Sequence, residues 1–168
     1  MSPERRALLR GRFDLPRYPR PIGALAPMAF EEACTQCGDC ARACPEGILL
    51  RDAEGFPVLD IREGACTFCA ACTAACETGA LLADQPFPWR AAADERCLSV
   101  NGIQCRACED HCDAQAIRFR LLQGGRSEPR FDTAACTGCG ACAAPCPAGA
   151  ISLQPFSPQQ PPMETRPC

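Results

Sequence analysis

The sequence contains no lysine, only one histidine, one tryptophan and one tyrosine, and no long apolar run. A Rieske centre needs two histidines on one iron, so a single histidine excludes it. A membrane-spanning helix needs roughly 18 or more consecutive apolar residues. No stretch approaches that length, and we therefore do not expect an integral membrane protein. All 17 basic residues are arginine, a bias that we attribute to a GC-rich genome.

A sustained apolar segment is also missing behind the arginine pair Arg5–Arg6 in "MSPERRALLRGRF". The best candidate for an export signal, "IGALAPMAF", is short, is interrupted by Gly23 and Pro27, and lacks a clear cleavage site. We therefore expect a cytoplasmic protein. Cysteines in that compartment are reduced and bind metal more often than they form disulfides.

The charge is divided unevenly along the chain. Residues 1–20 contain six arginines against Glu4 and Asp14, a net charge of +4, whereas the whole chain has a net charge of −3. An acidic body argues against nucleic acid as a partner. The sequence also shows no nucleophile–base constellation, no phosphate-binding loop and no substrate-binding domain, so we do not expect an enzyme.

Against these absences stands a large excess of cysteine, 17 of 168 residues. Sixteen of them fall into four groups of four, and Cys168 is left over. The groups are Cys34, Cys37, Cys40 and Cys44; Cys66, Cys69, Cys72 and Cys76; Cys97, Cys105, Cys108 and Cys112; and Cys136, Cys139, Cys142 and Cys146.

The spacing of these cysteines predicts cubane iron–sulfur clusters. Three cysteines at positions i, i+3 and i+6 place three thiolates inside one tight loop, which can wrap a body several ångströms across. A zinc ion is smaller and usually takes two cysteines from each of two separate knuckles. The run C-x2-C-x2-C-x3-C-P is the bacterial ferredoxin pattern, in which the fourth cysteine ligates the other cluster of a pair. We therefore expect four [4Fe–4S] clusters.

The third group departs from the pattern, because seven residues separate Cys97 from Cys105. Lengthening a loop costs little entropy, so Cys97 can still reach the same iron. We interpret this group as a working fourth site. The alternative is a three-iron or labile cluster with Cys97 unused. Cys168 could substitute for Cys97, but we expect Cys168 to be a free thiol of the tail.

The spacers between the groups divide the chain into two modules. "ILLRDAEGFPVLD" and "AIRFRLLQGGRSEPRFD" each read as a hairpin, whereas "ADQPFPWRAAADER" contains two prolines and no second strand. The predicted fold is α+β: two tandem bacterial-type dicluster ferredoxin-like modules with extended N- and C-terminal tails. The predicted boundaries are 1–29 for a basic arm, 30–84 for the first module, 85–92 for a linker, 93–154 for the second module and 155–168 for a proline-rich tail. Phe87 and Trp89 in the linker are expected to pack the modules together.

Where a hairpin joins two groups, each group should supply its fourth cysteine to the cluster of the other group. Cys34, Cys37 and Cys40 would then bind one cluster with Cys76, and the second group would take Cys44. The third and fourth groups would exchange Cys112 and Cys146 in the same way. The alternative pairs the outer two groups and the inner two.

The motifs "RRALLRGRF", "CTQCGDCARACPEGIL", "PFPW" and "CLSVNGIQCRACEDHC" together resemble those of the NapF ferredoxin-type proteins of the periplasmic nitrate reductase system. The resemblance runs across nearly the whole chain. It implies a cytoplasmic accessory protein that acts on the precursor of the catalytic molybdenum subunit before export, in iron–sulfur loading or redox activation. It also implies that Arg5, Arg6, Arg10 and Arg12 could bind this partner, although a solvated basic tail is an equal interpretation. The alternative function is an electron-transfer polyferredoxin that relays electrons to or from an oxidoreductase, and a third is an iron–sulfur sensor.

Overall fold

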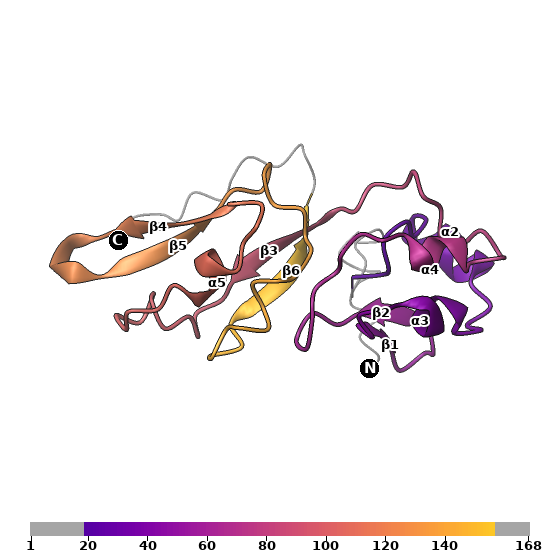
Figure 1. Cartoon of the computed structure of the whole chain (residues 1–168), viewed down its shortest axis with the longest axis horizontal. Coiled ribbons are helices and arrows are strands. Elements are labelled where there is room, and N and C mark those ends of the chain that lie inside the picture. Colours follow the sequence, from indigo (N-terminus) through magenta and orange to yellow (C-terminus); the bar gives the residue numbers. More distant parts are fainter. Residues whose placement is uncertain (1–18, 157–168) are drawn as a thin grey trace, which may run out of the picture.

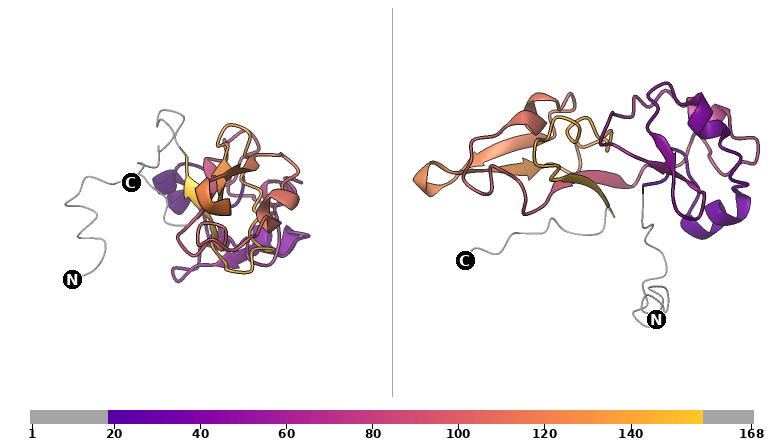
Figure 2. Two further views of the ribbon diagram at one scale, coloured as in Figure 1. Left: turned by 90° about the vertical axis from the view of Figure 1, so that its left-hand side faces the viewer. Right: turned by 90° about the horizontal axis from the view of Figure 1, so that it is seen from below.

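The computed structural model describes residues 19–156. They form two modules that lie end to end along the long axis of the molecule, as Figure 1 and the view from below in Figure 2 both show. Within these residues, no helix is both long enough and apolar enough to cross a membrane. The first module contains α2 (Pro27–Ala33), α3 (Asp39–Ala43), β1 (Leu49–Arg51), β2 (Pro57–Leu59) and α4 (Ala71–Ala74). The second contains β3 (Trp89–Ala93), α5 (Ala107–Asp110), β4 (Ile117–Leu121), the 3-10 turn η1 (Gln123–Gly125), β5 (Ser127–Phe131) and β6 (Ile151–Pro155).

Both predicted hairpins are confirmed. Strands β1 and β2 pair antiparallel with Leu49 opposite Leu59, and β4 and β5 pair antiparallel with Ile117 opposite Phe131. In the first hairpin the Asp52 carboxylate accepts hydrogen bonds from the backbone N–H groups of Glu54 (3.0 Å) and Phe56 (2.9 Å). This turn chemistry fixes the register of the short strands.

The spacer before the third cysteine group was interpreted as a linker with no second strand, and that interpretation is wrong for residues 89–93. Residues 89–93 form β3, which pairs antiparallel with β6 so that Trp89 lies opposite Pro155 and Ala93 opposite Ile151. Residues 89–92 were assigned to the linker from the sequence. The strand forms because its partner comes from the other end of the module, about sixty positions later. Local sequence contains no sign of such a pairing.

The first module has a shorter version of the same closure. Ala24 and Leu81 form an isolated antiparallel bridge, in which Leu25 N–H donates to Ala80 O (3.1 Å) and Leu82 N–H donates to Gly23 O (2.7 Å). Residues 19–29, which the sequence analysis placed in an extended arm, therefore pack on the module. Residues 1–18 and 157–168 lie outside the described residues, so the extended conformation of the two tails stays a prediction.

The buried side chains form one cluster that reaches through both modules. It includes Phe30, Ile61, Trp89, Ile117 and Leu153. Within the described residues five cysteines are buried, namely Cys40, Cys72, Cys97, Cys108 and Cys142, and all but Cys97 belong to this cluster. The elements are short and the sheets have two strands each. The apolar core alone is therefore small for the length of the chain.

A buried ion pair holds the chain before α2 against the first hairpin. Arg20 Nη1 lies 2.6 Å from Asp52 Oδ2, with the two side chains only 15% and 5% exposed. The guanidinium also lies 5.3 Å from the ring centroids of Phe30 and Phe56. Burial raises the pKa of Asp52, but hydrogen bonds from Arg20 and from the Phe56 and Glu54 N–H groups outweigh it and lower the pKa below its ordinary value.

This pair predicts a pH-dependent contribution to stability. Because the pKa of Asp52 is lower in the folded protein, its stabilisation is fully present above the unfolded value of about 3.9 and is lost as pH falls through the folded value. Replacing Asp52 by Asn keeps a carbonyl acceptor for the turn and removes the charge. At pH 7 we expect Asp52→Asn to lower the free energy of unfolding by about 1–2 kcal/mol, measured from the anaerobic urea midpoint. The difference from wild type should shrink below pH 4.

Asp94→Asn is the matched control. Asp94 also accepts a backbone N–H, from Arg96, and pairs with the Arg96 guanidinium, but that pair is 41% and 62% exposed. Exposed pairs contribute little. An equal shift of the urea midpoint in both variants would contradict a special contribution of the Arg20–Asp52 pair.

Candidate iron–sulfur sites

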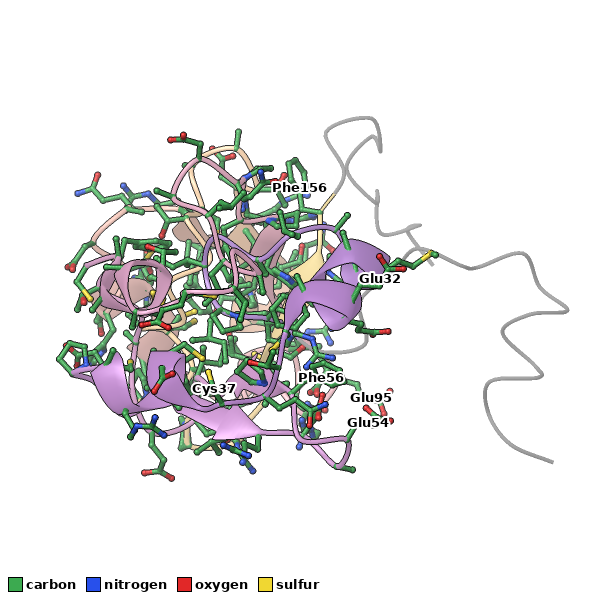
Figure 3. All side chains as sticks on the ribbon, turned by 90° about the vertical axis from the view of Figure 1, so that its right-hand side faces the viewer. Glu32, Cys37, Glu54, Phe56, Glu95 and Phe156 are labelled. Atoms are coloured by element: carbon green, nitrogen blue, oxygen red, sulfur yellow. The ribbon has the colours of Figure 1, made fainter. Side chains whose placement is uncertain are left out.

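The first three cysteine groups are each built around a loop that leads into a short helix, α3, α4 or α5, whereas the loop of the fourth group leads into a turn at residues 141–145. In the first group, Cys34 follows the last residue of α2, Cys40 lies inside α3, and Cys44 follows the last residue of α3. Figure 3 looks onto the outer end of the first module and shows Cys37 on this face, where its side chain is exposed. The loop thus carries cysteines that range from exposed to buried.

The loops of three groups share an unusual backbone conformation. The residues on both sides of the second cysteine have positive φ angles: Gln36 and Gly38, Phe68 and Ala70, and Gly138 and Gly140. These two reversals bend the backbone tightly around the second cysteine. The conformation costs a non-glycine residue about 1–2 kcal/mol, and such strain is concentrated at functional sites. Gln36, Phe68 and Ala70 accept that cost, which indicates that the loop shape itself is needed.

The third group reaches a similar end by another route. Arg106, which follows Cys105, has φ −134°, so the double reversal is missing there. The longer loop is instead fixed by its own hydrogen bonds. The Asn101 amide donates to Glu95 O (2.7 Å) and Cys97 O (2.8 Å), and the buried Ser99 hydroxyl lies 2.7 Å from Ser127 O. Cys97 is buried and lies close enough to Cys108 for its charge to raise the Cys108 pKa.

The structure brings the first group together with the last cysteine of the second group. Cys34, Cys37, Cys40 and Cys76 line one cavity that opens to solvent, and Cys44 does not line it. Cys44 is instead a neighbour of Cys66. This arrangement favours exchange of the fourth cysteines within the first module. The corresponding exchange of Cys112 and Cys146 in the second module remains a prediction.

Burial governs the chemistry of the inner thiols. It raises the pKa of Cys72 and Cys108 to about 11 and that of Cys142 to about 12, and nearby thiols add to each shift. Cys76 differs: burial raises its pKa, but hydrogen bonds from the Thr78 hydroxyl and the N–H groups of Leu81, Ala80 and Thr78 together lower it. Crowded, buried thiols disfavour negative charge, whereas bound iron requires thiolates and offsets their repulsion.

Backbone N–H groups point at several of the sulfurs. Ala116 N–H lies 3.3 Å from Cys112 Sγ, Ala150 N–H lies 3.4 Å from Cys146 Sγ, and Ala91 N–H lies 3.5 Å from Cys136 Sγ. In two of these the donor follows the cysteine by four residues, across a turn whose third residue, Gln115 or Gly149, has a positive φ. Hydrogen bonds to the sulfurs are one of the main determinants of cluster potential.

These features fit a cubane cluster. Within residues 19–156, no three His, Cys, Asp or Glu side chains are arranged to hold a single metal ion. In the first module the thiols of Cys34, Cys37, Cys40 and Cys76 instead lie around one cavity, as the four separate iron atoms of a cluster require. Thiolates are also the ligands that iron–sulfur clusters use. Arg5, Arg6, Arg10, Arg12 and Cys168 lie outside the described residues.

Sequence reasoning missed two features that position these sites. One is the β3–β6 pair, whose Ala91 donates to Cys136 Sγ. The other is a hydrogen bond between the modules, from Cys66 N–H to Cys139 O at 2.8 Å. Neither has a local sequence signal, because both join residues far apart in the chain. The expectation that Phe87 packs the modules together is confirmed, since its ring makes an edge contact with Phe68 and lies beside Gly138.

Comparison with known proteins agrees with this geometry. The family model of the 4Fe-4S dicluster domain matches residues 33–80 and again residues 103–150. Two dicluster domains hold four [4Fe–4S] clusters. The cofactor prediction and the prediction of two tandem α+β ferredoxin-like modules are therefore confirmed.

Similar proteins cover most of the chain. The ferredoxin-type protein NapF of Haemophilus influenzae is 43% identical over 136 residues, which are 80% of this chain and 77% of that protein. NapF of Escherichia coli K12 is 35% identical over 127 residues, 74% of this chain and 77% of its own length. The methylamine utilization ferredoxin-type protein MauM of Paracoccus denitrificans is 36% identical over 155 residues, 80% of this chain and 69% of its own length. With its two dicluster domains, its cysteine loops and this extent of similarity, the chain belongs to the NapF family of ferredoxin-type iron–sulfur proteins.

Proposed function

We propose that this protein is a non-catalytic, cytoplasmic accessory protein that assists the maturation of the catalytic molybdenum subunit of a periplasmic nitrate reductase before export. The observation that carries the proposal is the likeness to NapF along four fifths of the chain. The assistance consists of iron–sulfur loading or redox activation of the precursor.

Sixteen cysteines are proposed to ligate the four clusters in sets of four. The sets are Cys34, Cys37, Cys40 and Cys76; Cys66, Cys69, Cys72 and Cys44; Cys97, Cys105, Cys108 and Cys146; and Cys136, Cys139, Cys142 and Cys112. The cavity shared by Cys34, Cys37, Cys40 and Cys76 supports the first set. Four thiolates at each cluster leave no iron open for substrate, which is the reason to propose an electron or cluster carrier and not an enzyme.

The arm carrying Arg5, Arg6, Arg10 and Arg12 is the proposed docking segment. It precedes Pro19 and Arg20, which lie beside the first hairpin, where Leu59 N–H donates to Pro19 O at 2.7 Å and Arg20 pairs with Asp52. An oxidised cluster with its four thiolates carries a charge of about −2. The net charge of the protein with its clusters is therefore more negative than the formal charge of −3 of the chain alone. A basic arm on such a body can bind an acidic partner that the body itself would repel.

An anaerobic capture experiment from the cytoplasmic fraction tests this proposal. The full chain should retain the signal-bearing nitrate reductase precursor but not the exported mature form. A variant lacking residues 1–18 should lose at least ten-fold in captured precursor. The deletion stops before Pro19 and Arg20, since these residues hold the first module together.

A second variant replaces Arg5, Arg6, Arg10 and Arg12 by glutamine and keeps the length of the arm. Loss of capture with this variant assigns the binding to charge. The matched control replaces Arg118, Arg120 and Arg126, on the β4–β5 hairpin of the second module, by glutamine. The amount of precursor that it captures should be unchanged. Equal capture of precursor by all variants would remove the arm from the proposal, and failure of the full chain to capture the precursor would overturn the proposal itself.

The second candidate function is an electron relay between oxidoreductases. The contact between Cys66 and Cys139 favours it, because it brings cysteine loops of both modules together. In that case the same capture would recover only quinol oxidases or reductases.

A further inference from the structure

The second and fourth cysteine loops meet at the boundary between the two modules. The Cys66 N–H donates to the Cys139 carbonyl oxygen at 2.8 Å. Both residues are proposed cluster ligands, one from each module. Backbone hydrogen bonds inside a packed interface have a fixed geometry, so this bond holds the two loops at one separation.

A glycine next to Cys139 allows this close approach. Gly140 has φ +86°, and a Cβ placed on it would lie 2.6 Å from the Cβ of Ile61 and still closer to its Cγ2. Ile61, which follows β2 in the first module, is buried. The loop of the second module therefore packs its bare backbone directly against the first module, and any side chain at position 140 would push the two apart.

An aromatic contact closes the other side of the same boundary. The rings of Phe68 and Phe87 meet edge to face with centroids 6.2 Å apart. Phe87 in turn lies against Gly138, where a Cβ would fall 2.9 Å from its ring. Phe68 belongs to the second cysteine loop and Gly138 to the fourth. Phe87, from the connecting segment, therefore fills the space between the two loops.

We propose that these contacts form a fixed junction that sets the two inner [4Fe–4S] clusters side by side, so that the four clusters make one electron path through the whole chain. We refer to the contacts of Cys66, Ile61, Phe68 and Phe87 with residues 138–140 as the junction. The path runs from the site of the first group to that of the second, across the junction to the fourth, and on to the third. The inference rests on the ligand sets proposed above.

Each step on this path transfers one electron. The donating cluster returns from its reduced to its oxidised state while the next cluster is reduced, and no proton or bond is exchanged. The path has its two ends at opposite ends of the molecule, because the first and third groups lie away from the junction in their modules. A one-electron donor at one end could therefore reduce an acceptor bound at the other end.

The test compares three variants of the full holo-protein, reduced with dithionite. Gly140→Ala adds a side chain at the junction. Gly124→Ala is its matched control, since Gly124, in the turn between β4 and β5, also has a positive φ, +76°, but nothing lies within 4 Å of its Cβ position. Phe87→Ala removes the ring that the connecting segment places between Phe68 and Gly138, and it changes no residue of either cysteine loop.

Two readouts are taken on each sample after iron and sulfide analysis. In wild type and Gly124→Ala, the Cys66 amide should be protected from hydrogen exchange, and the reduced electron paramagnetic resonance spectrum should show spin coupling beyond that of isolated pairs. In Gly140→Ala and Phe87→Ala, exchange at Cys66 should be at least ten-fold faster and only pairwise coupling should remain.

A wild-type spectrum that already equals two independent pairs, with an unprotected Cys66 amide, would overturn the junction. The metal analysis separates this result from failure of the ligand sets. A wrong ligand assignment would appear as low iron content or missing pairwise coupling, whereas a wrong junction would leave both normal. Capture of the nitrate reductase precursor is independent of either readout.

Discussion

Removal of iron is expected to abolish cooperative unfolding of this protein. Among residues 19–156, five buried side chains are cysteines of the proposed clusters, and the longest strands span five residues. Modules of about 60 residues with so little apolar core are marginal by themselves. The free energy of cluster binding is therefore also free energy of folding.

The buried thiols strengthen this expectation. Cys72, Cys108 and Cys142 have pKa values raised to about 11, 11 and 12 by burial and by neighbouring thiols. Without iron these positions would hold neutral thiols, and the cavity lined by Cys34, Cys37, Cys40 and Cys76 would have no cluster to fill it. The atoms that line an empty cavity have no partner atoms on one side and lose that dispersion energy, and the small apolar core does not offset the loss.

Anaerobic calorimetry and circular dichroism before and after chelation measure the effect. The loaded protein should unfold in one or two sharp transitions, and the chelated protein should show none. Reconstitution with iron and sulfide is the control and should restore the transitions. A cooperative thermal transition in iron-free protein would contradict the expectation.

Replacement of Cys97 by alanine is expected to remove one cluster. Iron should fall from about 16 to about 12 atoms per chain, because three thiolates would leave one iron corner of the third site open to solvent. The ordered loop around Cys97, fixed by Asn101 and Ser99, is the structural reason to expect that this cysteine is used. Anaerobic iron and sulfide analysis, together with visible absorbance, gives the count.

Two variants serve as controls for this count. Cys105→Ala should lose the same cluster, and Cys168→Ala should retain all four. Retention of about 16 iron atoms in Cys97→Ala would show that Cys97 is not needed. Loss of iron in Cys168→Ala would instead assign the open corner to Cys168. A wild-type count of three clusters would refute a working third site altogether.

The cysteine spacing determined the cofactor and the number of clusters, and the spacers between the groups determined the division into two modules. The reason is that three ligands of each cluster lie within about seven to twelve consecutive residues, so the chemistry is local and visible in the spacing. The hairpins were equally predictable, since turn residues such as Asp52 and Gly55 act on their immediate neighbours. The left-handed residues Gln36, Phe68 and Ala70 were not, because only the folded loop imposes that conformation.

Only the tertiary structure decided how the modules are closed and joined. The segment "WRAAA" has weak strand propensity and becomes β3 because β6 pairs with it from the far end of the module. Arg20 looked like part of a basic arm, yet it is an anchor for Asp52 in the first hairpin. The junction depends on Gly140 meeting Ile61 and on Cys66 meeting Cys139, more than seventy positions apart in the sequence. Contacts between residues so far apart follow from packing and not from local pattern, so no reading of neighbouring residues could reveal them.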